Sequence, residues 1–356
     1  MHFLIVEAKY LELLLSALEE SEAKTEADAS SVDWTWEERY IVLLWLSHLL
    51  FAPFDLSTIS SVDADDLEIP PINGFSWPAN VPGIVIRLLP LAIKYISVPG
   101  KERDAAKALL VRMATRRDMQ ALGILHALVS WSLSYLRPKK DAPPMTPYHY
   151  IGVLSFLSGV LGSSSDTSDM DKYLSDIFWS THAIASNEVP ALTSVVSTTP
   201  ARKAIIKVIR TITVQALRRP NQDPAGTELV ETSIGFLLES LADNDTPVRF
   251  AASKALSIVT LKLDADMASQ VVEAVLDSLN RNVLLVKNPR NPAAPPMRDL
   301  TSVDALEWHG LMLTLSHLLY RRSPPAENLA DIVHALLMGL SFERRNASGG
   351  SMGTNV

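Results

Sequence analysis

The segment 231–279 constrains the fold of this chain more strongly than any other, because three apolar periods of helical spacing follow one another within it. The first two periods are separated by the turn 243–249, whose sequence is Asp-Asn-Asp-Thr-Pro-Val-Arg. Thr246 is a suitable N-cap for the second helix. Pro247 fits the first helical turn, where its missing N–H would have had no partner. The segment therefore predicts an antiparallel pair of helices with a sharp corner, followed by a third helix.

One helical pair of this kind cannot cover its own apolar faces. Ile234, Leu237 and Leu241 share a face before the turn, and the third period presents Val272 and Val275 to a further neighbour. Stacking of successive pairs solves this problem, and similar periods recur along the chain at an irregular spacing of about 40 residues. The sequence therefore predicts an all-α fold, a HEAT/armadillo-type helical-repeat solenoid. Such arrays usually bind other proteins.

The apolar periods also predict the domain organisation. We expect residues 1–18 to form the end of a preceding repeat helix, with a polar, acidic linker at 19–31. The repeat array is predicted over 34–342, interrupted by loops near 57–82, 138–147 and 282–302. Residues 343–356 are expected to form a flexible, truncated tail, and no strand-like alternation occurs. Pro90 should kink or split its helix.

Charge and residue usage exclude several classes of function. Asp and Glu outnumber Lys and Arg by 40 to 32, and the net charge of −8 disfavours nucleic acid as the main partner. The absence of cysteine excludes disulfides, thiolate metal sites and cysteine nucleophiles. The most apolar stretch, 41–54, is shorter than the roughly 18–20 residues that span a bilayer. No metal, nucleotide or catalytic motif occurs. We therefore predict a non-enzyme without cofactor, catalytic or metal-binding residues, and without membrane insertion.

Several segments match a known family in their order along the chain. They are the Trp-rich segment 34–47 with Pro53-Phe54-Asp55-Leu56 after it, Arg202-Lys203, the turn residues Asp245, Val248, Arg249, Ala252 and Lys254, and Glu307-Trp308-His309-Gly310. With these segments the chain resembles the tubulin-folding cofactor D (tubulin-specific chaperone D) family. Residues 351–356 resemble the start of a further family motif. Because family members are several times longer, we expect this chain to be an internal or truncated piece of the array.

The resemblance implies a chaperone that acts after the cytosolic chaperonin. It implies capture of β-tubulin, and work with cofactors C and E and an Arf-like small GTPase in assembling or dismantling the αβ-tubulin heterodimer. GTPase-activator activity is implied only for the complete multi-cofactor complex, and no motif marks an arginine for it. The implied location is the cytoplasm, with microtubule association as a further expectation. An adaptor for other protein cargo, in transport or trafficking, stays open as an alternative.

Two basic clusters are candidate partner-binding sites. Lys203, Lys207 and Arg210 have the spacing i, i+4, i+7 of one helix face, and Arg202 lies beside them. This basic stripe would suit an acidic partner surface, although a solvated helix face is the more ordinary interpretation. The same two interpretations hold for a second cluster, which consists of Arg112, Arg116 and Arg117.

Other conspicuous residues have a structural interpretation. Asp243, Asp245 and Arg249 stand where helical repeats commonly place paired charges, so we expect them to fix the turn and the register between repeats. Tryptophan is frequent at interfaces, but Trp45 lies in a segment, 36–51, that is apolar on nearly every face. We therefore expect Trp45 to pack in the core, together with Trp34, Trp36 and Trp308.

Overall fold

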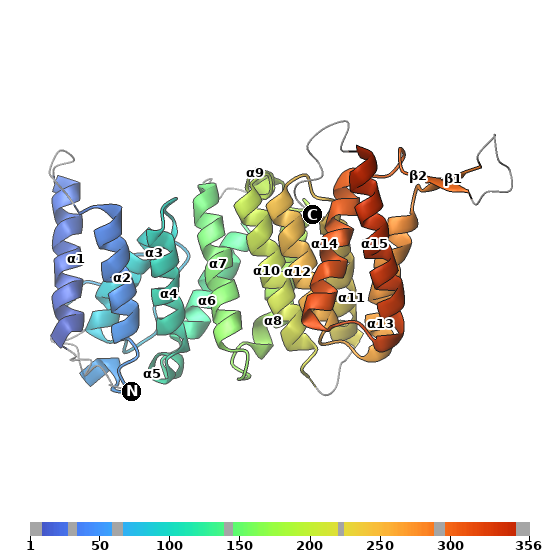
Figure 1. Ribbon diagram of the computed structural model, residues 1–356. Helices are drawn as coiled ribbons and strands as arrows, with labels where there is room; N and C mark the ends of the chain where they lie inside the picture. The colour runs from blue at the N-terminus through green and yellow to red at the C-terminus, as the bar shows by residue number, and fades with distance from the viewer. Residues whose placement is uncertain are drawn as a thin grey trace, which may run out of the picture. The chain divides into compact units, whose positions relative to one another are not determined.

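The computed structural model describes residues 9–27, 34–58, 67–138, 145–219, 224–287 and 296–346, which are mostly helical (Figure 1). The chain divides into two compact units, Met1–Val208 and Ile209–Val356. The boundary falls inside helix α10, Thr199–Ala216. The predicted motif at 351–356, most of the predicted tail, and residues 288–295 of the loop predicted at 282–302 lie outside the described residues.

The first unit contains two layers of helices. One layer consists of α2 (Trp36–Leu49), α4 (Glu102–Thr115) and α7 (Pro147–Ser163), which lie side by side (Figure 1). The other elements among the described residues of this unit are α1 (Lys9–Ala27), α3 (Gly83–Ile96), α5 (Arg117–Ala121), α6 (Ile124–Leu136), α8 (Leu174–Ala185), α9 (Thr193–Val196) and 3₁₀ turns at Leu56–Thr58, Asp171–Tyr173 and Pro190–Leu192. The helices α3 and α6 pack against α7 and supply much of the core.

The acidic segment after residue 18 is helical, so the expected linker is wrong over its first part: α1 continues to Ala27. The reason is that carboxylates of α1 form ion pairs with basic side chains of α3. Arg87 donates to Glu19 at 2.6 Å and to Glu12 at 2.6 Å, while Lys94 and the Tyr95 hydroxyl both donate to Glu22. The acidic residues, which the sequence pattern places in a solvated linker, are therefore paired with α3. Residues 28–33 lie outside the described residues.

Two helix boundaries also differ from expectation. Pro90 does not split α3, because most of this helix is buried and the packing outweighs the proline penalty of about 3 kcal/mol. The apolar period over 119–136 predicts one helix, but the structure divides this segment at Gly123, whose φ of 84° is a left-handed conformation that glycine adopts without strain. The result is the short helix α5 followed by α6.

The second unit contains the helical pair that the turn predicts. Its elements after α10 are α11 (Pro224–Glu239), a 3₁₀ turn η5 (Ser240–Ala242), α12 (Thr246–Thr260), α13 (Ala265–Asn280), α14 (Ala305–Arg321), a 3₁₀ turn at Ala326–Asn328 and α15 (Leu329–Asn346). The helix α12 packs against both α11 and α14, and α14 also contacts α13 and α15. The three predicted helices are therefore present. The N-cap of α12 is Asp245 rather than Thr246, one residue earlier than expected.

The loop expected at 282–302 contains a short antiparallel hairpin that the sequence pattern did not predict. Its strands are β1 (Leu284–Val286) and β2 (Met297–Asp299), with Leu284 opposite Asp299. Strands of three residues are too short to show a period of two, and all three residues of β1 are exposed. Apart from this hairpin, the regular structure of the described residues is helical.

Candidate functional site

A hollow of about 340 Å³ lies in the first unit, where the end of α2 and the segment after it meet the junction of α4 and α5. Its lining residues are Leu50, Phe51, Ala52, Pro53, Asp55, Arg112, Thr115, Arg116, Arg117 and Asp118. The second basic cluster of the sequence is thereby brought together with the Pro53–Leu56 segment. The three arginines of this cluster, Arg112, Arg116 and Arg117, have different surroundings and therefore different roles.

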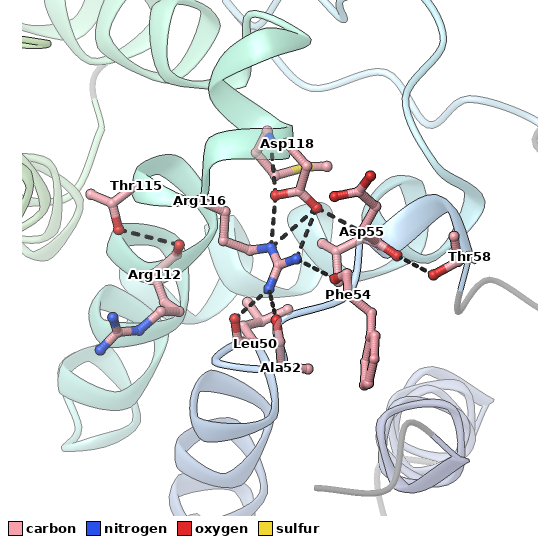
Figure 2. Close-up of polar contacts among 11 residues, drawn as sticks. Leu50, Ala52, Phe54, Asp55, Thr58, Arg112, Thr115, Arg116 and Asp118 are labelled. Atoms are coloured by element: carbon pink, nitrogen blue, oxygen red, sulfur yellow. Dashed lines mark hydrogen bonds and ion pairs between the residues drawn. The ribbon is translucent and has the colours of Figure 1, made fainter.

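Arg116 is a structural clamp that holds the chain after α2 (Figure 2). Its guanidinium donates to three main-chain carbonyls, those of Leu50 at 2.5 Å, Ala52 at 3.0 Å and Phe54 at 2.7 Å. It also forms two hydrogen bonds of 2.9 Å with the carboxylate of Asp118. Both side chains are nearly buried, with exposed fractions of 10% and 12%. Arg116 therefore has no free donor directed at a partner.

Asp118 completes this clamp. Its carboxylate accepts hydrogen bonds from the main-chain N–H of Leu56 and of Met119, both at 3.0 Å. Burial alone would raise the pKa of Asp118, but the bonds from Arg116 and from the Leu56 N–H lower it below its ordinary value. The carboxylate is therefore charged at neutral pH and neutralises Arg116.

Arg112 has a different environment. Its guanidinium carbon lies 3.2 Å from the centre of the Phe51 ring, a cation–π contact. Burial lowers the pKa of Arg112 from its ordinary value. Within the described ranges, no carboxylate pairs with it. Arg117 is exposed and likewise has no ion-pair partner among the described residues. The hollow therefore contains two unpaired cations.

The face of α2 that leads to this hollow is apolar and exposed. Ile41, Trp45 and Phe51 have exposed fractions of 52%, 59% and 55%. The expectation that Trp45 packs in the core is therefore wrong, and so is that for Trp36, which is 44% exposed. Among the described elements, α2 packs mainly against α1 and α4, and these contacts leave Ile41 and Trp45 exposed. An all-round apolar pattern indicated a helix buried on every side, whereas the structure has an exposed aromatic strip.

The basic stripe lies on α10, where its residues have unequal exposure. Lys203 and Lys207 are exposed. Arg202 is partly buried and donates to the carbonyls of Val196 and Ser197, both at 3.0 Å. Arg210 is also partly covered, and burial together with a neighbouring arginine lowers its pKa. The two lysines are thus the members of the stripe that face solvent.

Arg249 organises the turn between η5 and α12. It is 5% exposed and donates to the carbonyls of Asp243 at 2.6 Å and Asn244 at 3.0 Å, and to the Thr246 hydroxyl at 2.8 Å. The Asp243 carboxylate accepts from the N–H of Asp245 at 2.8 Å. The guanidinium donors of Arg249 are thus used within the second unit, which leaves Arg249 unavailable to a partner.

The Trp308-His309-Gly310 step of α14 meets three neighbouring elements of the second unit. Trp308, which is buried, donates its indole N–H to the carbonyl of Leu279 at 3.1 Å. His309 accepts from Nε of Arg249 at 3.0 Å. A Cβ at Gly310 would lie 2.0 Å from the carbonyl oxygen of Leu241. The step therefore fixes α14 against α13, α12 and η5.

Two family models match the chain. The first, described as "Tubulin-specific chaperone D-like, ARM repeat", matches residues 1–136, and the second, "Tubulin-specific chaperone D-like, ARM repeats", matches residues 195–285. The chain belongs to the tubulin-specific chaperone D-like family. Together the two matches cover more than half of it and agree with the helices, which confirms the prediction of an all-α helical-repeat fold.

One relative of this chain is Tubulin-folding cofactor D of Schizosaccharomyces pombe. It is 24% identical to this chain over 327 residues, which cover 87% of the chain and 26% of that protein. The chain thus spans about a quarter of the length of this relative. No solved structure matches the chain.

Each candidate site falls within one of the two regions that the family models match. The hollow and its aromatic strip lie in the first matched region, whereas the stripe and the Arg249 turn lie in the second. The described residues contain no group of three or more His, Cys, Asp or Glu side chains suited to a metal ion. None of the helices in the described ranges is both long enough and apolar enough to cross a membrane.

His149 is a buried titratable residue that the sequence pattern did not single out. His149 is 3% exposed, and its Nδ1 lies 2.6 Å from the Ser97 hydroxyl. The ring packs against Trp131 and Tyr135, with centroid distances of 5.8 Å and 4.3 Å. Burial lowers the pKa of His149 to about 4. It is therefore a neutral core residue at physiological pH.

His149 should make stability depend on pH. An unfolded histidine has a pKa of about 6.5 and takes up a proton below that value, whereas His149 in the fold does so only near pH 4. The stabilisation is complete above pH 6.5 and is lost as the pH falls toward 4. Between pH 7 and pH 5, we expect the free energy of unfolding to fall by about 2 kcal/mol.

Urea unfolding of the chain and of His149→Leu at pH 7 and pH 5 measures this contribution. The variant should lose most of the pH dependence in this range. His48→Gln, a change at an exposed histidine of α2, is the control and should leave it in place. An equal pH dependence in the His149→Leu variant would contradict the assignment.

Proposed function

We propose that this chain is a protein-binding segment of a tubulin-folding chaperone. The observation that supports this most directly is family membership: two tubulin-specific chaperone D-like models match the chain, and its relative is named Tubulin-folding cofactor D. The client we propose is β-tubulin released from the chaperonin. We further propose that the protein acts on the αβ-tubulin heterodimer together with cofactors C and E and an Arf-like GTPase. The proposed location is the cytoplasm, near microtubules.

The surface chemistry supports binding by extended helix faces. The described residues offer exposed apolar side chains on α2 and exposed lysines on α10, each carried by a regular helix. Residues held by regular helices keep fixed spacings, which suits recognition of a folded surface. Binding energy in such an arrangement is distributed over several helices and does not require a reactive group.

Binding to tubulin is tested by a pull-down with the immobilised chain. The preys are folded αβ-tubulin and β-tubulin released from the chaperonin, and Tubulin-folding cofactor D of S. pombe is the positive control. We expect retention of β-tubulin by the chain. Capture by the control but not by the chain would contradict tubulin binding by this segment. Retention of unrelated cargo alone would favour the alternative, a helical-repeat adaptor.

The basic stripe is proposed to face the acidic side of the client. Lys203→Glu combined with Lys207→Glu should weaken tubulin capture by about tenfold, and more strongly at low salt, because opposite charges attract across an interface. The control is Lys262→Glu, a reversal at an exposed lysine after α12. Equal losses in both variants would show a general charge effect and would remove the stripe as a site.

GTPase activation is proposed only for the assembled set of cofactors. An arginine from this chain would have to reach the nucleotide of tubulin, where it would stabilise the transition state. Single Arg→Ala variants at the exposed positions, assayed with all cofactors present, test this contribution. Uniform activity across the variants would remove it for this segment.

A further inference from the structure

We infer that the hollow beside Phe51 is a docking site for an acidic, partly apolar peptide segment of a protein partner. In this site, a carboxylate of the segment pairs with Arg112. Flanking apolar side chains of the segment pack along the exposed face of α2. This inference goes beyond the proposed function, because it assigns a binding chemistry to one surface and does not depend on tubulin as the partner.

The first support is the state of Arg112. Its guanidinium has lost part of its hydration and lies over Phe51, yet no carboxylate of the described residues pairs with it. Figure 2 shows its end directed away from the Arg116–Asp118 clamp. A guanidinium carries five N–H donors in a planar fork, and a carboxylate is the protein group that matches this fork with two hydrogen bonds. An unpaired, partly desolvated arginine costs stability, and a partner carboxylate would offset that cost.

The second support is the charge of the hollow. Three arginines and two aspartates line it. Arg116 and Asp118 neutralise each other within hydrogen-bond distance, so Arg112 and Arg117 remain against Asp55 alone. The site therefore carries an excess of positive charge in a chain whose net charge is −8. This local excess is complementary to an acidic segment.

The third support is the apolar strip that leads to the hollow. Ile41 and Trp45 are spaced i, i+4 on α2 and are both more than half exposed, and the His48 ring continues the face at 6.1 Å from Phe51. Exposed aromatic side chains beside an arginine are the composition of interface hot spots. A phosphate group or nucleic acid would use the cations but leave this strip uncovered. A peptide with both acidic and apolar side chains covers both features.

Fluorescence anisotropy with the full chain tests the inference. The probe is a labelled synthetic peptide in which glutamates flank leucine and phenylalanine, and it is compared with the same peptide carrying glutamine and with one carrying phosphoserine in place of glutamate. We expect the glutamate peptide to bind. The glutamine peptide should bind at least about tenfold more weakly, because the charge pair is lost.

Arg112→Gln should weaken binding of the glutamate peptide by a similar factor without lowering Tm. This combination separates a binding role from a structural one, since loss of a structural arginine lowers Tm. Arg103→Gln is the matched control: Arg103 lies in the same helix, is also partly buried and does not line the hollow. Phe51→Ala should also weaken binding.

Four results would overturn the inference. They are failure of all three peptides to bind, equal binding of the glutamate and glutamine peptides, a preference for the phosphoserine peptide, and unchanged binding by the Arg112→Gln variant. A chain that binds tubulin but fails this test would retain the proposed function and lose only the docking site.

Discussion

Arg116→Met should lower the free energy of unfolding of the first unit by about 3–5 kcal/mol, the range found when one partner of a buried ion pair is removed. The substitution leaves the Asp118 carboxylate, which is 12% exposed, without its counter-ion. It also removes the donor for three carbonyls of the chain after α2. The methionine fills a similar volume, so the loss reports the polar contacts rather than a cavity.

Urea denaturation followed by circular dichroism measures the global effect, and hydrogen exchange of the Leu56 N–H measures the local one. This N–H donates to Asp118, so it should exchange faster in the variant. Arg117→Met is the matched control. Arg117 is exposed and has no ion-pair partner among the described residues, so its removal should change stability by less than about 0.5 kcal/mol.

The double variant Arg116→Met, Asp118→Asn separates the two causes. If the uncompensated carboxylate accounts for most of the loss, the second substitution should restore part of the stability. If the three carbonyls account for most of it, the double variant should be no more stable than the single one. A loss below about 1 kcal/mol in the single variant would show that the clamp does not fix this segment.

The fold was predictable where local preference and apolar spacing agree. The turn 243–249 combines a capping residue, a proline and a change of apolar face, and each of these acts within a few residues. The helices on both sides of this turn were therefore predicted correctly. The extension of α1 to Ala27 was not predictable, because it depends on pairing of Glu19 and Glu22 with α3, far along the chain.

The candidate site was only partly predictable for a related reason. The sequence identified Arg112, Arg116 and Arg117 as one basic cluster, but it could not separate a clamp from an unpaired cation, since the carbonyls that Arg116 binds come from another segment. It also assigned Trp45 to the core, because apolar spacing gives the faces of a helix but not the number of its neighbours. The resemblance of Pro53-Phe54-Asp55-Leu56 to the family was a second indication that pointed to this region.

The Gly310→Ala variant should lose about 3 kcal/mol of stability, although alanine is the better helix former. The added Cβ would lie 2.0 Å from the carbonyl oxygen and 2.8 Å from the carbonyl carbon of Leu241. Both atoms are main chain, so no side-chain rotation relieves the overlap and α14 must move away from η5. That movement would also strain the bond between His309 and Arg249.

Gly235→Ala is the matched control, since Gly235 lies inside α11 of the same unit and a Cβ there would have no atom within 4 Å. This variant should gain about 0.5–1 kcal/mol, because alanine loses less backbone entropy than glycine in a helix. The same chemical change should thus have opposite signs at the two positions in urea denaturation. Equal signs would mean that helix propensity governs both sites. Opposite signs would mean that the close approach of α14 to η5 requires glycine at position 310, which explains the glycine of the Trp308-His309-Gly310 step by packing.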